Sequence, residues 1–164
     1  MLLVILYGVL HLSSVQTWLV KKIAVNLSKN LHTKVTVQKV DIRFFNKVLL
    51  QGVMIEDLQK DTLLFAGTVK ANVNDWFFFK DKISLDNVGL NDAVVNMKRS
   101  DSVWNYQFLM DYFASPKKKK TNSKEVVIDL KELHFTNIKF NKIDGWIGQN
   151  MIANIGKLDV LMEL

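Results

Sequence analysis

Two stretches of this chain repeat one spacing of apolar residues: ISLDNVGLNDAVVNM at 83–97 and IDLKELHFTNIKFNK at 128–142. When the two are aligned, apolar residues coincide along their whole length. The coinciding pairs are Ile83 and Ile128, Leu85 and Leu130, Val88 and Leu133, Leu90 and Phe135, Ala93 and Ile138, and Val95 and Phe140. A repeated spacing of this kind predicts a repeated structural unit.

The spacing places apolar residues at i, i+2, i+5 and i+7, and it occurs four times, at 35–42, 48–55, 83–90 and 128–135. Steps of two are typical of a strand with one buried face. The middle step of three would turn the second half to the opposite face, so a β-bulge or a tight bend must absorb one residue. Gly52 and the pair Asp86–Asn87 are residue types that suit such a bend.

The predicted fold class is mainly β with an N-terminal helix. Short polar connections, including Asn91–Asp92, and the absence of an evident helical crossover predict an antiparallel meander, which forms a curved, groove-like sheet. One short aromatic helix is expected at 102–113, where Trp104, Phe108 and Tyr112 recur in steps of four. This helix is expected to cover one face of the sheet, and a ligand-specific aromatic box is the alternative.

Length and composition indicate one globular domain. The 164 residues contain no cysteine, which excludes disulfides, thiolate metal sites and thiol nucleophiles. The formal charge of +6 comes largely from four consecutive lysines at 117–120. They lie in a lysine-rich segment, 115–124, that reads as a solvated loop; contact with anionic lipid headgroups is the alternative.

The N-terminal residues divide into two segments. Residues 1–13 are apolar and read as the end of an N-terminal membrane anchor, although a buried helix of a soluble domain remains possible from the sequence. Residues 14–32 predict an amphipathic helix, followed by a repeating β-groove domain over 33–164 that we expect to continue in a longer chain. Loop charge does not decide the orientation of the anchor. The residues expected on one helix face are Val15, Trp18, Leu19, Ile23, Leu27 and Leu31, and those expected at the membrane interface are Trp18, Lys21 and Lys22.

No catalytic or metal-binding motif is present in the sequence. His11, His32 and His134 each stand without a second histidine or a carboxylate at ligand spacing, and no glycine-rich phosphate loop or nucleophile elbow occurs. The lysine run has no interleaved aromatic residues, which disfavours nucleic-acid binding. The sequence therefore predicts a protein that is not an enzyme and that has no cofactor, no metal and no nucleic-acid partner.

Seven short segments of the sequence are similar to segments of a known protein family. They are VQTWL at 15–19, VDIRFFN at 40–46, LQGVMIED at 50–57, DTLL at 61–64, VVNMKR at 94–99, WNYQFLMDYF at 104–113 and IGKLDV at 155–160. In these segments the chain resembles the N-terminal portion of the TamB (translocation and assembly module) family of AsmA-like proteins. The chain is much shorter than a full family member.

The resemblance implies a location and a function. TamB-like proteins are anchored in the inner membrane of Gram-negative bacteria by one N-terminal helix and extend through the periplasm as a β-rich groove with an apolar interior. They act in outer-membrane biogenesis, in protein translocation and assembly and in phospholipid transfer. The outer-membrane assembly partner contacts a C-terminal region that this chain lacks.

Within such a groove, the repeated apolar positions would contact phospholipid acyl chains. The alternative is that they pack only against one another, in a structural β-domain that serves as an adaptor or spacer of the cell envelope. The candidate lining residues are Val35, Val37, Val40, Ile42, Val53, Ile55, Ile83, Leu85, Val88, Leu90, Ile128, Leu130, Leu133 and Phe135.

Overall fold

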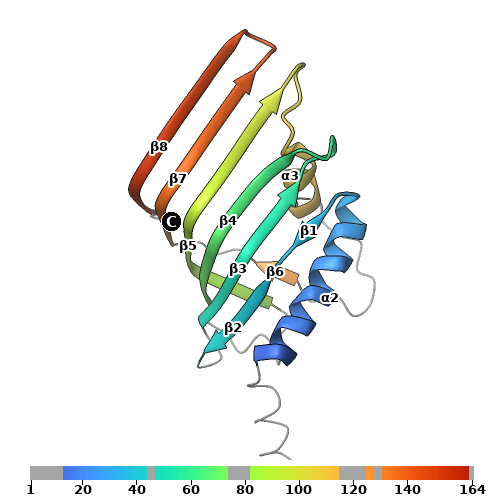
Figure 1. The fold of residues 1–164 in the computed structure, drawn as a ribbon, viewed down its shortest axis with the longest axis vertical. Coiled ribbons are helices and arrows are strands. Elements are labelled where there is room, and N and C mark those ends of the chain that lie inside the picture. The colour runs from blue at the N-terminus through green and yellow to red at the C-terminus, as the bar shows by residue number, and fades with distance from the viewer. Residues whose placement is uncertain (1–12, 44–46, 74–81, 115–124, 128–130, 163–164) are drawn as a thin grey trace, which may run out of the picture.

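The computed structural model describes residues 13–43, 47–73, 82–114, 125–127 and 131–162 (Figure 1). The described residues form one open eight-stranded sheet with two helices beside it. The elements are α2 (Ser13–Leu31), β1 (Val35–Thr36), β2 (Lys39–Arg43), β3 (Lys47–Glu56), β4 (Thr62–Val73), β5 (Lys82–Arg99), α3 (Gln107–Ala114), β6 (Glu125–Val127), β7 (Glu132–Asp144) and β8 (Gln149–Leu161).

The sheet has the strand order β1-β3-β4-β5-β7-β8, with β2 following β1 along the same side of β3 and β6 paired with the start of β5. The predicted class, mainly β with an N-terminal helix and a curved open sheet, is confirmed. Two pairings depart from the antiparallel meander, because β5 is parallel both to β7 and to the short strand β6. The long connection at 100–131 contains α3 and returns the chain to the end of the sheet where β5 began, so a parallel pairing becomes possible there.

The two stretches that opened the sequence analysis pair with each other. In the parallel register of β5 and β7, Val88 lies beside Leu133 and Leu90 beside Phe135, with the same offset along both strands. The repeated spacing is therefore a spacing of direct neighbours in the sheet. Residues 93–97 and 138–140 are parts of these same long strands.

Four rows of apolar residues cross the sheet from β1 and β2 to β8, and we call the surface that carries them the apolar face. Each row contains one residue from β1, β2 or the segment between them, and one from each of β3, β4, β5, β7 and β8. All of these residues are apolar. The rows are Val35-Ile55-Leu64-Val95-Phe140-Ala153, Val37-Val53-Ala66-Ala93-Ile138-Ile155, Val40-Leu50-Val69-Leu90-Phe135-Leu158 and Ile42-Val48-Ala71-Val88-Leu133-Val160.

A further row, between the second and third apolar rows, contains the residues at which the strands break their alternation. We call it the pivot row. It includes left-handed backbone at Gly52 (φ 60°), Asp92 (φ 53°) and Asn137 (φ 55°), on the three strands β3, β5 and β7, which run in the same direction. The full row is Gln38, Gly52, Gly67, Asp92, Asn137 and Gly156.

The pivot row explains the step of three in the sequence. A left-handed residue absorbs the extra position, so apolar side chains on both sides of it return to the same face. The bend predicted at Gly52 is confirmed, and so is a bulge at Asp86, because Asn72 pairs with Asn87 while Val73 pairs with Leu85. Asn91–Asp92, predicted as a connection between strands, lies instead inside β5, since Asp92 provides the pivot of that strand.

Helix α2 closes one edge of the sheet with two hydroxyl groups. The Ser28 hydroxyl oxygen accepts a hydrogen bond from the Val35 N–H at 2.8 Å, and the Thr17 hydroxyl oxygen accepts one from the Val40 N–H at 3.2 Å. Ala24, between them on the helix, is buried and allows the close approach. The two hydroxyl groups therefore accept hydrogen bonds from backbone N–H groups at the outer edge of β1 and β2, as a neighbouring strand does elsewhere in a sheet.

The helix faces differ from the predicted arrangement. Leu27 and Leu31 pack against the core as expected, but Trp18 is 60% and Ile23 64% exposed. The side chains of Val15 and Leu19 lie outside the described residues. The prediction that these six residues share one packing face is wrong, because the helix turns Thr17, Ala24 and Ser28 toward the sheet edge. The packing stripe on α2 consists of Val20, Ala24, Leu27 and Leu31.

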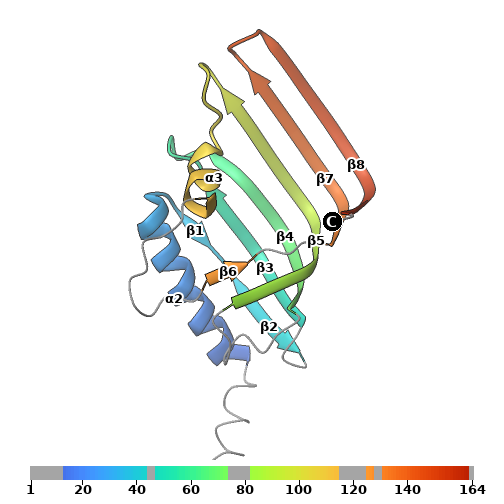
Figure 2. The same cartoon turned by 180° about the vertical axis from the view of Figure 1, so that it is seen from behind.

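Helix α3 begins later than predicted, at Gln107. Phe108 and Tyr112 pack against the core, as expected of a helix that covers the sheet. Trp104 precedes the helix, and the Arg99 guanidinium lies 4.6 Å from the centre of its ring. Figure 2 shows α2, α3 and the short β5–β6 pairing on the same side of the sheet, near its β1–β3 end.

We predict that Gly52→Ala destabilises the fold by about 1–2 kcal/mol, because an L-residue pays this cost in the left-handed region and the added methyl group overlaps the Gln38 side chain. Gly156→Ala is the matched control, since a methyl group there meets nothing within 4 Å. Urea unfolding of both variants measures the difference. Equal stabilities would contradict the role assigned to the pivot row.

Candidate functional site

The apolar face is covered at one end and open at the other. Beneath α2, Val40 is fully buried, with 0% exposure, and Val37 is almost so. In the same row as Val40, at the opposite end of the sheet, Leu158 on β8 is 42% exposed. Among the described strands, α2 contacts β1 and β2, and α3 lies beside it, so three of the four rows emerge from cover toward β7 and β8 (Figures 1 and 2). In the second row, Ala93 on β5 and Ile138 on β7 are still buried.

The predicted lining residues that the structure describes all lie on the apolar face, but in two different settings. Those on β1, β2 and β3 belong to the covered end of the rows, and those on β5 and β7 belong to the half-buried part. Buried residues are Val35, Val37, Val40 and Val53; half-buried residues are Ile42, Ile55, Val88, Leu90, Leu133 and Phe135. The side chains of Ile83 and Leu85, and the whole of Ile128 and Leu130, lie outside the described residues.

Sequence reasoning missed much of the open part of the apolar face. Leu158, which is exposed, and Ile155 and Val160, which are half-buried, all come from β8, and none of them was among the expected lining residues. The signal was present: Ala153, Ile155, Leu158 and Val160 repeat the i, i+2, i+5, i+7 spacing around Gly156. In β5 and β7, Val95 and Phe140, which the alignment of the two stretches had already paired, also lie on the apolar face, although they were not counted among the lining residues.

The three residues expected at a membrane interface lie on the side of α2 that faces away from the sheet. Lys21 and Lys22 are exposed, and the Lys22 ammonium lies 5.4 Å from the centre of the Trp18 ring. Residues 1–12, which contain almost all of the expected anchor, lie outside the described residues. Among the helices that the structure does describe, none has the length and hydropathy needed to cross a membrane.

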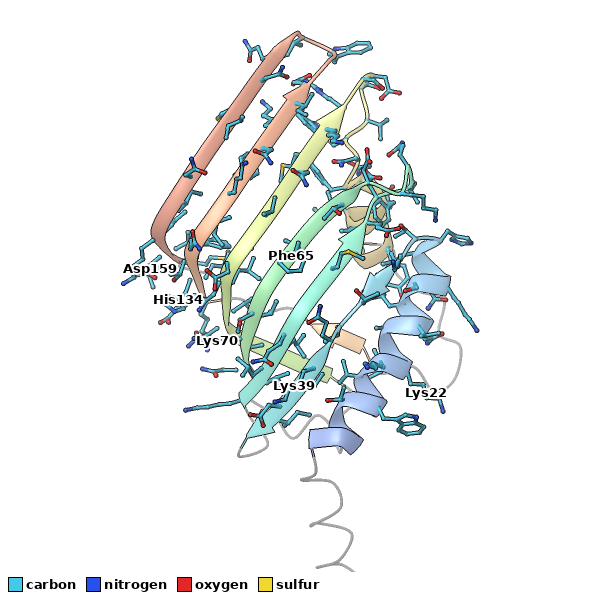
Figure 3. All side chains as sticks on the ribbon, viewed as in Figure 1. Lys22, Lys39, Phe65, Lys70, His134 and Asp159 are labelled. Atoms are coloured by element: carbon cyan, nitrogen blue, oxygen red, sulfur yellow. The ribbon has the colours of Figure 1, made fainter. Side chains whose placement is uncertain are left out.

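The opposite face of the sheet, which we call the polar face, carries most of the charged side chains of the strands, although exposed apolar residues such as Phe65 and Ile152 also lie on it. It contains an ionic cluster formed by Glu132, His134, Lys157 and Asp159. Nδ1 of His134 lies 2.7 Å from Asp159 Oδ1, and Nε2 lies 3.2 Å from Glu132 Oε2. Figure 3 shows His134 and Asp159 side by side on β7 and β8. The expectation that His134 stands apart from carboxylates is wrong, because Asp159, 25 residues away in sequence, is its direct cross-strand partner.

The ionic cluster is suited to holding β8 against β7. The hydrogen bond with Asp159 raises the pKa of His134 above its ordinary value of 6.5, and Glu132 adds to this effect while burial opposes it. Both ring nitrogens are engaged by carboxylates, so neither is available to a metal ion. Within the described ranges, no group of three His, Cys, Asp or Glu side chains is placed to hold a metal ion.

A pocket of about 460 Å³ lies apart from the open end of the apolar face, between α2, α3 and the β3–β4 turn. Leu31, Leu58 and Phe108 supply its apolar surface, and Asp111 and Tyr112 lie at its polar side. It is a shallow recess where the two helices meet the sheet, and the apolar rows do not run through it.

Comparisons with known proteins give no relative for this chain. No model of a known family, no curated protein and no solved structure matches it.

We predict that His134 stabilises the fold in a pH-dependent manner. Because its pKa is raised in the folded state, the stabilisation is complete below the unfolded value and is lost as the pH rises through the folded value. His134→Gln should therefore lower the free energy of unfolding at about pH 5 but have a much smaller effect at about pH 9. Denaturant unfolding at a series of pH values measures this.

The control for this series is His32→Gln, which removes an exposed histidine outside the cluster and should leave the pH dependence in place. A pH dependence that persists unchanged in His134→Gln would show that the cluster does not contribute. Asp159 has a lowered pKa through the same hydrogen bond, so its contribution is lost in acid, as the pH falls through the folded value.

Proposed function

We propose that this chain is the membrane-proximal part of a non-catalytic protein of the TamB and AsmA-like type. It would be anchored in the inner membrane of a Gram-negative bacterium, with the β domain in the periplasm. There it would act in outer-membrane biogenesis by passing phospholipid, with its acyl chains on the apolar face, and by supporting the translocation and assembly of proteins. Its outer-membrane assembly partner would contact a C-terminal region absent from these 164 residues.

The observation that carries the proposal is the continuity of the four apolar rows up to an exposed strand. Beyond the covered β1–β3 end, the rows continue across β4, β5, β7 and β8, which are three spacings of about 4.8 Å, or about 14 Å. One leaflet of the hydrocarbon core is about 15 Å thick, so this part of a row is comparable in length to an extended acyl chain. Each methylene group that leaves water for this surface contributes about 0.8 kcal/mol.

The exposed side of α2 supports the same proposal. Trp18 places an aromatic ring beside two lysines immediately after the apolar N-terminal residues, an arrangement typical of the boundary between hydrocarbon and headgroups. With this boundary at the start of α2, the sheet would stand next to the membrane from which lipid is taken. The lysine-rich segment 115–124, as a solvated loop or a headgroup contact, is compatible with this location.

A second candidate function is favoured by the burial at the β1–β3 end. Val37, Val40 and Val53 are already covered, so that part of the apolar face forms an ordinary core and is closed to lipid. If a partner protein covers the remaining rows in the same way, the domain is an adaptor or spacer of the envelope without lipid transport. The two functions differ in what touches β8.

We predict that a photo-crosslinking amino acid at Leu158 captures phospholipid in cells, since this side chain is the exposed end of an apolar row. The matched control is Lys157, its neighbour on β8, which points to the polar face and should capture little or none. Mass spectrometry of the crosslinked, purified protein identifies the adduct.

Phospholipid on Leu158 but not on Lys157 supports the conduit. Protein adducts alone at Leu158 would support the adaptor. Equal lipid capture at both positions would contradict a specific apolar path, because it would show only that β8 lies near a membrane.

A further inference from the structure

At the carboxyl ends of β5 and β7, the apolar face gives way to charged residues. Beyond the first apolar row, Lys142 of β7 lies on this face between Met97 of β5 and Met151 of β8. The next position on the same face pairs Arg99 of β5 with Asp144 of β7. Two cations and one carboxylate therefore mark this end of the apolar surface.

The carboxylate of Asp144 holds the charged residues together, and its side chain is fully buried. Its two oxygens accept hydrogen bonds from Nε and Nη2 of Arg99, both at 2.7 Å, and Oδ1 accepts a further one from the Ile147 N–H at 3.3 Å. Nζ of Lys142 lies 4.0 Å from Oδ2 of the same carboxylate. Two cations thus share one anion, and one positive charge is left without a counter-charge within the group formed by Arg99, Lys142 and Asp144.

Both cations have N–H groups that the described residues leave unused. Neither Nη1 of Arg99 nor Nζ of Lys142 donates a hydrogen bond to any residue that the structure describes. The two cations also lie beside one aromatic ring: the Arg99 guanidinium carbon is 4.6 Å and the Lys142 nitrogen 5.5 Å from the centre of the Trp104 ring. Unused donors on two neighbouring cations suit the oxygens of a phosphate group.

The structural alternative is that this group only fastens the connection before α3 to the sheet. Arg99 is sufficient for that role, because its guanidinium pairs with Asp144 and lies over the Trp104 ring. Lys142 adds no hydrogen bond to a described residue, and its side chain is 32% exposed. Lys142 is therefore the member of the group that the attachment does not require.

The apolar face is long enough along its strands to hold a lipid chain that starts at Lys142. On β7, the span from Phe140 to Leu133 is at most about 23 Å, at about 3.3 Å per residue. One leaflet of the hydrocarbon core is about 15 Å thick. An acyl chain that begins beside Lys142 can therefore lie along β7, past Phe140 and Phe135, without leaving the apolar face.

We propose that Arg99, Lys142 and Trp104 form a headgroup site for a phospholipid with net negative charge, whose acyl chains lie along β5 and β7. Nη1 of Arg99 and Nζ of Lys142 donate hydrogen bonds to the phosphate oxygens. The excess positive charge favours an anionic headgroup over a zwitterionic one that carries its own cation. This inference rests on the proposed contact between lipid and the apolar face, and it adds the charge and the orientation of the lipid.

The test uses the 164-residue chain in detergent micelles that contain equal amounts of phosphatidylglycerol and phosphatidylcholine with identical acyl chains. After free lipid is removed, mass spectrometry quantifies both lipids on the protein. We expect about tenfold enrichment of phosphatidylglycerol on the parent, because hydrogen bonds to charged groups are the strong ones. Lys142→Gln should abolish the enrichment with an unchanged melting temperature, and Lys142→Arg should retain it.

Two lysine variants of the same region are the matched controls. Lys139→Gln removes an exposed charge from β7 on the polar face, and Lys131→Gln removes an exposed lysine that precedes β7, at the opposite end of the apolar rows. Both should keep the enrichment. An excess of inorganic phosphate should leave phosphatidylglycerol bound, because the acyl chains contribute to its binding.

The outcomes separate the headgroup site from the proposed function. Lipid binding without enrichment, or enrichment that survives Lys142→Gln, would overturn the site and leave the lipid contact in place. Loss of enrichment in Lys131→Gln instead would overturn it too, as would displacement of phosphatidylglycerol by inorganic phosphate. Absence of both lipids from the parent and all variants would contradict the proposed lipid contact itself.

Discussion

The long strands of this sheet break their alternation at one common level while keeping their apolar side chains on one face. The positions at which this happens lie side by side in one row, from Gln38 to Gly156. Left-handed residues on β3, β5 and β7 absorb the extra position, and on β4 Gly67 leaves space for the left-handed Asp92 beside it. Without these pivots, two of the four apolar rows would lie on the opposite face of the sheet, and neither the core beneath α2 nor the open surface at β8 would exist in its present form.

The two faces and the two edges of the sheet then acquire separate roles. Helix α2 closes the first edge with the hydroxyls of Ser28 and Thr17 and buries the nearby rows, which gives the fold its core. The remaining rows stay half-exposed toward β8, where an acyl chain or another protein surface can contact them. On the polar face, His134 joins β7 to β8 through Asp159, so that β8 is held in register with β7.

Much of this architecture could be predicted from the sequence, because it depends on local spacing. The strands, the bend at Gly52 and the common face of the apolar positions follow from the i, i+2, i+5, i+7 pattern alone. The parallel pairing of β5 with β7 could not be predicted, since it depends on how the connection around α3 returns the chain. The orientation of α2 was also hidden: hydrophobicity favours Trp18 and Ile23 as packing residues, whereas edge hydrogen bonds select Thr17 and Ser28. The partnership of His134 with Asp159 arises only from the register of β8.

The central claim is that the pivot turns both halves of each strand to one apolar face that is open at β8. The chain has no cysteine, so single cysteines can be introduced one at a time at 152–160 and labelled with a fluorophore. Quenching by phospholipids with brominated acyl chains then reports which positions contact hydrocarbon. The account predicts strong quenching at Ala153, Ile155, Leu158 and Val160, with a step of three across Gly156. Strict alternation through 156, or uniform quenching along the strand, would contradict it.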